Sequence, residues 1–248
     1  MSLTHLRPRT AGEILDGAFV LYRRHFAVLV AAALLPSLPP MAYRMVATAA
    51  GGVPPGAQSV LVVYDTAVTI LLWGALVGLC SSAVTGEPVS LGAAYRRARE
   101  HFWRLLGISF VSGFWILLGL VFFVVPGVVA FVFLFLSSHV ALNEGAGVLK
   151  SVERSWELSR LNRWRLTGVA LVTGVISMLP FLLLGAGLGM IEEQVPWVVG
   201  MSGLFEILLV ALMYPFLAAS ATLLYYDFRV RSEALDLHSA TESLAALA

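Results

Sequence analysis

Six long runs of apolar residues constrain this chain more than any other feature of its sequence. The hydrocarbon core of a bilayer is about 30 Å thick, and a helix of about 20 apolar residues crosses it. Hydrophobic residues make up 59% of the chain and charged residues only 12%, too little polar surface to coat a soluble globule. This excludes a water-soluble enzyme, a nucleic-acid-binding protein and a disordered chain. The sequence predicts an all-α, polytopic integral membrane protein with six transmembrane helices, at residues 26–48, 59–84, 105–125, 127–143, 166–190 and 203–226.

Prolines and one short connection shape these predicted spans. Three prolines, Pro36, Pro39 and Pro40, predict a kink or a break in the first span. Proline is tolerated within the bilayer where neighbouring helices cover the carbonyl that it frees. Val125-Pro126-Gly127 leaves room only for a tight turn between the third and fourth spans, which therefore form a hairpin.

Positive charge falls almost entirely in alternate connections. Every Lys and Arg except Arg44 lies before the first span, between the second and third, between the fourth and fifth, or after the sixth. Cytoplasmic loops of membrane proteins carry an excess of these residues. The sequence therefore predicts that both termini are cytoplasmic. The alternative for the N-terminus is a signal peptide with its apolar core at 26–35.

A similar basic segment precedes each odd-numbered span. Thr10 and Glu13 have the spacing of a capping box, which begins a helix. A basic helix with a bulky apolar face lies in the plane of the membrane interface, so the sequence predicts three cytoplasmic interfacial amphipathic helices. One face of the first helix holds Leu15, Phe19, Tyr22 and Phe26, and Leu91, Tyr95, Ala98 and Phe102 repeat this spacing in the second. In the third, the residues expected to lie inward are Leu149, Val152 and Trp156.

This recurrence suggests an internal repeat within one membrane domain, residues 1–231. We interpret 10–84, 90–143 and 146–226 as three parallel copies of a helix-plus-hairpin unit, related by an axis along the membrane normal. The alternative is that any protein with this charge distribution has basic amphipathic segments before its spans. The short cytoplasmic tail, 232–248, is expected to be a loose helix or disordered.

Three ionisable residues fall within the outer third of the predicted spans. Arg44, Asp65 and Glu206 come from the first, second and sixth spans, and we expect Arg44 to approach one of the two carboxylates. Charged groups inside a bilayer cost several kcal/mol and are by default candidates for function. One interpretation is a polar vestibule or an ion-coupled site. The other is a salt bridge that docks the first hairpin against the third.

The cytoplasmic side carries the remaining candidate site, a surface for lipid or a partner. Juxtamembrane arginines attract anionic lipid, whereas those after the sixth span could instead pair with Asp227, Glu153 or Glu157. The candidate contacts are Arg23, Arg24, Arg96, Arg97, Arg99, Trp156, Trp164, Arg165, Asp227, Arg229 and Arg231.

The remaining polar and small residues suggest structure rather than chemistry. The histidines lie on separate segments without metal-ligand spacing, and His139 is expected to be hydrogen-bonded packing. No catalytic residues, cofactor site or metal site are predicted. The GxxxG from Gly74 to Gly78 predicts close helix packing, within this chain or across a homodimer.

Four motifs carry a resemblance to a known family. They are Thr10-Ala-Gly-Glu13-Ile-Leu-Asp16 followed by Tyr22-Arg23-Arg24, Pro126-Gly127, Ser155-Trp156-Glu157-Leu158, and Tyr225-Tyr226-Asp227-Phe-Arg229-Val-Arg231. Together they resemble the membrane domain of bacterial glycerophosphodiester phosphodiesterases and related stand-alone bacterial membrane proteins. The resemblance implies a six-helix inner-membrane protein. It implies no catalytic site, because the phosphodiesterase activity resides in a separate soluble barrel.

The favoured function is that of a non-catalytic membrane scaffold or subunit. Its basic cytoplasmic face would bind anionic phospholipid and a protein partner, with no nucleic acid and with homo-oligomers left open. The alternative is a small transporter or lipid-handling protein with a central site between the hairpins. A transporter would need a water-filled centre lined by polar residues from all three hairpins. An enzyme acting on lipid within the membrane is a third hypothesis, for which the sequence offers no cluster.

Overall fold

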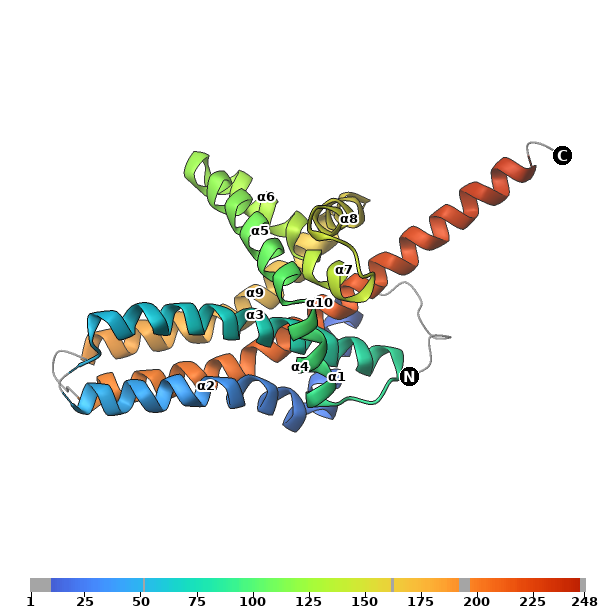
Figure 1. Cartoon of the computed structure of the whole chain (residues 1–248). Coiled ribbons are helices and arrows are strands. Elements are labelled where there is room, and N and C mark those ends of the chain that lie inside the picture. Colours follow the sequence, from blue (N-terminus) through green and yellow to red (C-terminus); the bar gives the residue numbers. More distant parts are fainter. Residues whose placement is uncertain (1–9, 51, 162, 192–196, 246–248) are drawn as a thin grey trace.

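The described part of the chain is entirely helical. The computed structural model describes residues 10–50, 52–161, 163–191 and 197–245, and within these ranges it contains ten α-helices and no strand (Figure 1). The helices are α1 (Ala11–Arg24), α2 (Phe26–Ala49), α3 (Pro55–Thr85), α4 (Leu91–Glu100), α5 (Phe102–Phe122), α6 (Val124–Leu134), α7 (Ser137–Asn143), α8 (Val148–Leu161), α9 (Arg163–Ile191) and α10 (Trp197–Ala245).

Six stretches are long and apolar enough to cross a membrane, which confirms the predicted fold class. They are Phe26–Ala47, Gly56–Thr85, Phe102–Phe122, Pro126–Asn143, Arg163–Leu188 and Gly203–Ser232. The protein is an all-α polytopic membrane protein. Helices α2, α3, α9 and α10 run alongside one another, and the α5–α6 hairpin leaves this bundle at an angle (Figure 1).

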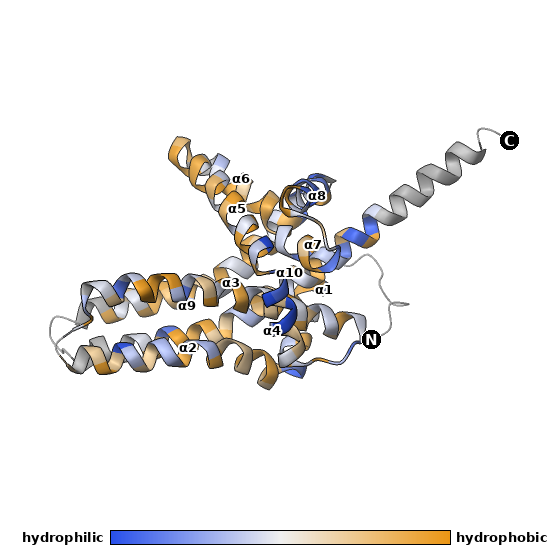
Figure 2. Cartoon of the chain, in the orientation of Figure 1, coloured by the Kyte–Doolittle hydropathy of each residue, from blue (hydrophilic) through white to orange (hydrophobic). Residues whose placement is uncertain are grey.

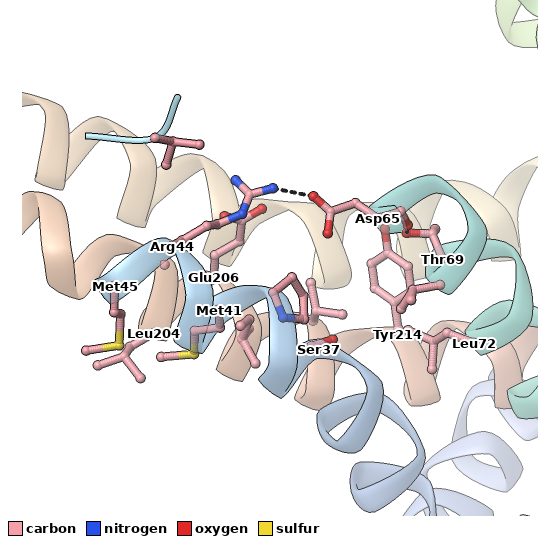
Figure 3. A pocket seen from close by; sticks show the side chains of 16 residues that line it. Ser37, Met41, Arg44, Met45, Asp65, Thr69, Leu72, Leu204, Glu206 and Tyr214 are labelled. Atoms are coloured by element: carbon pink, nitrogen blue, oxygen red, sulfur yellow. Dashed lines mark hydrogen bonds and ion pairs between the residues drawn. The ribbon is translucent and has the colours of Figure 1, made fainter. Parts of the chain in front are cut away.

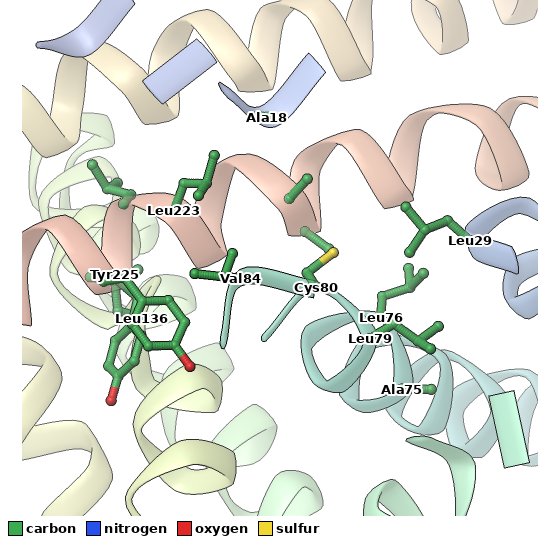
Figure 4. Close-up of a cluster of buried hydrophobic side chains, with 14 of the residues drawn as sticks. Ala18, Leu29, Ala75, Leu76, Leu79, Cys80, Val84, Leu136, Leu223 and Tyr225 are labelled. Carbon is green, nitrogen blue, oxygen red and sulfur yellow. The ribbon is translucent and has the colours of Figure 1, made fainter. Parts of the chain in front are cut away.

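The shorter helices α1, α4, α7 and α8 gather at one end of the bundle, which we call the basic end (Figure 1). The main core lies where they meet α2, α3 and α10, and it contains Leu29, Leu76, Leu136 and Tyr225 (Figure 4). Several of its members are alanines, among them Ala18, which is fully buried. Small side chains let helix backbones approach closely where lipid supplies no hydrophobic drive.

Of the kink or break predicted in the first span, the break does not occur, because α2 is continuous through its three prolines. A proline cannot donate a bond to the carbonyl four residues before it, so Pro36 frees the carbonyl of Ala32 and Pro40 frees that of Pro36. Tyrosines from other helices bond both carbonyls: the Tyr95 hydroxyl donates to Ala32 O at 2.6 Å, and the Tyr64 hydroxyl donates to Pro36 O at 3.2 Å. The carbonyls at these two positions are therefore satisfied, which allows the helix to continue through the prolines.

The fourth span, predicted as one helix over 127–143, is interrupted between α6 and α7. The turn falls at Phe135 and Leu136, next to the carbonyl of Phe133. The hydroxyls of Ser155 and Ser159 on α8 donate to that oxygen at 2.7 and 3.5 Å. Side chains from α8 thus replace a bond that an uninterrupted helix would have made for itself.

The predicted hairpin between the third and fourth spans is confirmed. Its turn lies at Phe123, whose backbone is extended, and Pro126-Gly127 falls in the first turn of α6 rather than in the connection. The two helices touch at glycines: a Cβ added to Gly119 would lie 2.7 Å from the backbone nitrogen of Gly127. No larger residue fits either position without moving the backbone.

The three amphipathic helices are present, each followed after one residue by a long helix. The capping box is confirmed: Thr10 Oγ1 accepts from the Glu13 backbone nitrogen at 3.2 Å, and the Thr10 nitrogen donates to Glu13 Oε2 at 2.7 Å. The repeat of whole helix-plus-hairpin units stays a prediction. The tail, expected to be either a loose helix or disordered, continues α10 as a helix to Ala245.

The predicted inward face of α8 is wrong in part, and in α1 the fully buried side chains differ from the bulky apolar face. In α1 the fully buried side chains are Ile14 and Ala18, whereas Phe19 is 52% exposed. In α8 the buried positions include Ser155, whereas Leu149 is 74% exposed. Small residues face the protein because they permit close contact between helices. The serines among them also donate to a backbone carbonyl that the neighbouring helix leaves free. The bulky apolar side chains are left for the bilayer, as expected of helices in the interface.

Candidate functional site

A half-open cavity of about 470 Å³ lies between α2, α3 and α10, at the end of the bundle away from the basic end (Figure 3). We call it the outer cavity. Its polar lining residues are Ser37, Arg44, Asp65, Thr69, Glu206 and Tyr214. Its apolar lining includes Met41, Met45, Val68, Leu72, Leu204, Ile207 and Val210. The three charged residues singled out in the sequence therefore share one cavity.

Arg44 and Asp65 form an ion pair at the mouth of this cavity (Figure 3). The predicted approach of Arg44 to a carboxylate is thus present. The pair joins α2 to α3 within the first hairpin, and docking of the first hairpin against the third stays a prediction. Glu206 brings a third charge from α10. The Arg44 and Asp65 side chains are 48% and 42% exposed, so a ligand can reach both.

The outer cavity does not extend through the bundle. Leu72, which is 2% exposed, forms part of its inner wall, and the fully buried Leu76 lies one turn further along α3. The lining comes from the first and third hairpins, α2, α3 and α10. A path across the membrane would require this core to move.

Asp227 forms the centre of a cluster at the basic end. Its side chain is fully buried, Arg231 Nε donates to Asp227 Oδ2 at 2.9 Å, and Arg165 Nη1 lies 3.6 Å from the same oxygen. Arg231, which follows the sixth span, thus pairs with Asp227, one of the partners considered for it in the sequence. Arg165 joins α9 to α10 through the same carboxylate. Arg229 is half-buried on the same helix.

A second cluster at this end was not visible in the sequence. The Tyr225 hydroxyl donates to Glu144 Oε1 at 2.8 Å, and Arg154 Nε lies 3.9 Å from Glu144 Oε2. The buried His139 ring stacks on Tyr225, with centroids 6.0 Å apart, and its Nε2 lies 3.3 Å from Thr222 Oγ1. His139 is hydrogen-bonded packing, as predicted. The Tyr225–Glu144 and Thr222–His139 partners are more than 80 residues apart along the chain, so no local pattern could have paired them.

Other basic-end arginines also hold the fold together. Arg97 Nη2 donates to the carbonyl of Leu142 at 2.6 Å, and Arg104 Nη1 donates to that of Gly145 at 3.0 Å. Both bonds satisfy carbonyls at and just beyond the C-terminus of α7, where positive charge is favourable. Arg97, proposed as a lipid or partner contact, therefore has a structural role.

The remaining candidate contacts are exposed. Trp164 is 81% exposed, and Trp156, 46% exposed, stacks on Phe133 with ring centroids 4.1 Å apart. The exposed cations of the basic end are Arg23, Arg24, Arg96, Arg99, Lys150, Arg160 and Arg163. Figure 2 shows hydrophilic residues gathered on α4, α8 and the part of α10 that leaves the bundle.

Two titratable groups at the basic end stay uncharged at neutral pH. Burial, with a smaller effect from the charge of Arg24, lowers the pKa of His25. Burial raises the pKa of Tyr95 to about 12, so its hydroxyl remains a donor to α2. Neither group therefore adds charge to the basic end near neutral pH.

The GxxxG motif packs within the chain. A Cβ on Gly74 would lie 2.6 Å from Leu105 Cδ1 and 3.1 Å from Ala98 Cβ, so α4 and α5 occupy this face of α3. No group of three or more potential metal-ligating side chains occurs among the residues that the structure describes. The cavity and the basic end are therefore the two places where the described surface offers charged groups to a ligand.

The fold defines a polytopic membrane protein. The chain belongs to the uncharacterised protein family UPF0259, whose model matches residues 57–218. Among its relatives are UPF0259 membrane proteins of Yersinia pestis (strain Pestoides F) and Yersinia pseudotuberculosis (serotype O:1b), each 36% identical over 93 residues. The matched segment is 38% of this chain and spans only 36% of the relatives' length. No solved structure matches the chain.

Proposed function

We propose that the protein is a non-catalytic scaffold or subunit of the bacterial inner membrane whose basic end binds anionic phospholipid and a protein partner. The observation that carries this proposal is the location of the exposed cations. They lie on α1, α4, α8 and the start of α9, which meet at one end of the bundle. Anionic lipid headgroups attract such a surface, and each Arg or Lys near them contributes about 1 kcal/mol to the binding free energy.

The internal bonds at this end support a surface that is held in place. The Arg97 side chain donates to a backbone carbonyl. Asp227 forms ion pairs with both Arg165 and Arg231. These bonds join α4 to α7 and α9 to α10, so the exposed cations are presented by helices that are held in place. The exposed Trp164 at the start of α9 suits the headgroup level, where tryptophan is enriched in membrane proteins.

Transport is the second candidate, and the structure favours it less. A transport site was expected to be lined by all three hairpins, whereas the outer cavity is lined by the first and third. The buried Leu72 and Leu76 separate it from the basic end. We further propose that the protein is related to the membrane domain of bacterial glycerophosphodiester phosphodiesterases. The name of the matched family does not mention that domain.

Lipid retention by an arginine variant tests the proposal. Arg96 and Arg99 are both exposed on α4, and Arg97 is left intact because it bonds Leu142. Replacing both with glutamine should weaken retention of phosphatidylglycerol about tenfold, since two charges contribute ~2 kcal/mol at most. Native mass spectrometry of the purified protein, in a series of salt concentrations, measures the retained lipid. Binding to the wild-type protein should fall as salt rises, because salt screens exposed charges.

The matched control is Glu100→Gln, which removes a negative charge from the same exposed part of α4. This variant should retain at least as much anionic lipid as the wild-type protein. Unchanged retention by Arg96→Gln/Arg99→Gln would contradict the proposal. If the wild-type protein also moved a solute across liposomes, transport would replace it.

A further inference from the structure

The outer cavity combines an excess of negative charge with access from outside. Arg44 supplies one positive charge against the carboxylates of Asp65 and Glu206. Glu206 belongs to the exposed class of residues and makes no ion pair with another described residue. The net negative charge of the lining therefore favours a ligand that carries a cationic group. A ligand carrying only negative charge would meet a net repulsion.

The rest of the lining is apolar and matches a hydrocarbon chain. Met41 and Met45 from α2 and Leu204 and Ile207 from α10 line the cavity beside the charged residues (Figure 3). Methionine is flexible and polarisable, so it adapts to irregular apolar ligands. A small hydrophilic cation would use none of this surface. The lining therefore fits an amphiphile whose charged part lies against Arg44, Asp65 and Glu206.

The depth of the site agrees with a lipid headgroup. Asp65 is ten residues from the start of α3, about 15 Å at 1.5 Å per residue. The 31-residue helix is about 46 Å long, longer than a hydrocarbon core of about 30 Å. If the excess is shared between the two ends, Asp65 lies about one turn of helix inside the hydrocarbon boundary, within reach of a headgroup.

We propose that the outer cavity binds the headgroup of a zwitterionic aminophospholipid. The ammonium donates to Glu206 and to the exposed side of Asp65, the phosphate accepts from Arg44, and one acyl chain lies along Met41, Met45 and Ile207. This assignment uses both signs of charge and the apolar lining together. It goes beyond the proposed function, which concerns anionic lipid at the opposite end of the molecule.

The test is competition between lipids for the purified full-length protein. Phosphatidylethanolamine and phosphatidylcholine carry the same charges, but the quaternary ammonium of the latter has no N–H to donate. Native mass spectrometry after titration with each lipid should show phosphatidylethanolamine bound about tenfold more tightly, as expected for charge-assisted hydrogen bonds. Glu206→Gln, which keeps size and removes the charge, should abolish this preference.

Two further variants separate the site from general effects on the fold. Glu157→Gln changes an exposed carboxylate at the basic end and should leave the preference intact. Thr66→Val removes a hydroxyl that donates to the carbonyl of Val62, at 2.8 Å, on the same helix but outside the cavity lining, and should also leave it intact. A preference that survives Glu206→Gln, or equal binding of the two lipids by the wild-type protein, would overturn the proposal.

A soluble headgroup distinguishes the lipid from a free solute. Phosphoethanolamine at millimolar concentration should fail to displace the bound lipid, because it cannot occupy the apolar lining. If it displaces the lipid at equal concentration, the site recognises a soluble zwitterion and the lipid assignment is wrong. Loss of anionic-lipid binding in Arg96→Gln/Arg99→Gln bears only on the basic end, so failure of one proposal does not imply failure of the other.

Discussion

Replacing Asp227 with asparagine is expected to lower the free energy of unfolding by about 3 kcal/mol. The carboxylate is fully buried and is contacted by Arg165 and Arg231, whose side chains are only 23% and 26% exposed. Removing one partner of a buried ion pair leaves the other charge uncompensated, which costs roughly 3–5 kcal/mol. The partial exposure of the arginines places this variant at the lower end of that range.

The matched control for this effect is Glu157→Gln. Glu157 pairs with Arg154 at 3.2 Å but is 58% exposed, and exposed pairs contribute about 1 kcal/mol or less. Unfolding in detergent, followed by circular dichroism under increasing denaturant, should separate the two variants clearly. Equal stability of Asp227→Asn and the wild-type protein would show that Asp227 does not anchor α9 to α10.

Replacing Gly119 with alanine is expected to open the α5–α6 hairpin. The added Cβ would lie 2.7 Å from the nitrogen and 2.8 Å from the Cα of Gly127. These are backbone atoms, so the clash cannot be relieved by a side-chain rotation. Overpacking typically costs roughly 1–3 kcal/mol, and we expect about 3 kcal/mol here because two helices must separate.

Gly113→Ala on the same helix provides the control, since nothing lies within 4 Å of the position of its Cβ. It should unfold like the wild-type protein, or slightly later because alanine favours helix. A cysteine pair placed across the hairpin gives a direct readout of its opening, as loss of crosslinking in Gly119→Ala. Crosslinking and stability equal to those of Gly113→Ala would contradict the close contact.

Hydropathy and local spacing were sufficient to predict the spans, the capping box and the hairpin. These features depend on residues close together in the chain, such as Thr10 with Glu13, or on the composition of whole segments. The continuity of α2 was not predictable in this way. It depends on Tyr64 and Tyr95, which bond carbonyls 28 and 63 residues earlier.

The candidate sites likewise divide into features that local sequence predicts and features that depend on residues distant in the chain. The convergence of Arg44, Asp65 and Glu206 was predictable because the three lie at similar depth in neighbouring spans. The role of Glu144 was not, because nothing local in a short loop indicates a bond to Tyr225. The serine face of α8 was not predictable either. Its serines bond the carbonyl of Phe133 at the interruption between α6 and α7, whereas hydropathy predicts one continuous span there.

The orientation of the basic end is the central claim of this account, and cysteine accessibility in intact cells tests it most directly. Gln58 at the start of α3 and Lys150 on α8 are both exposed and lie toward opposite ends of the bundle. The native Cys80 is fully buried, so it should not react. A membrane-impermeant maleimide should label Gln58→Cys from the periplasm and Lys150→Cys only after the inner membrane is permeabilised. Labelling of Lys150→Cys in intact cells, with Gln58→Cys protected, would place the basic end outside and contradict the account.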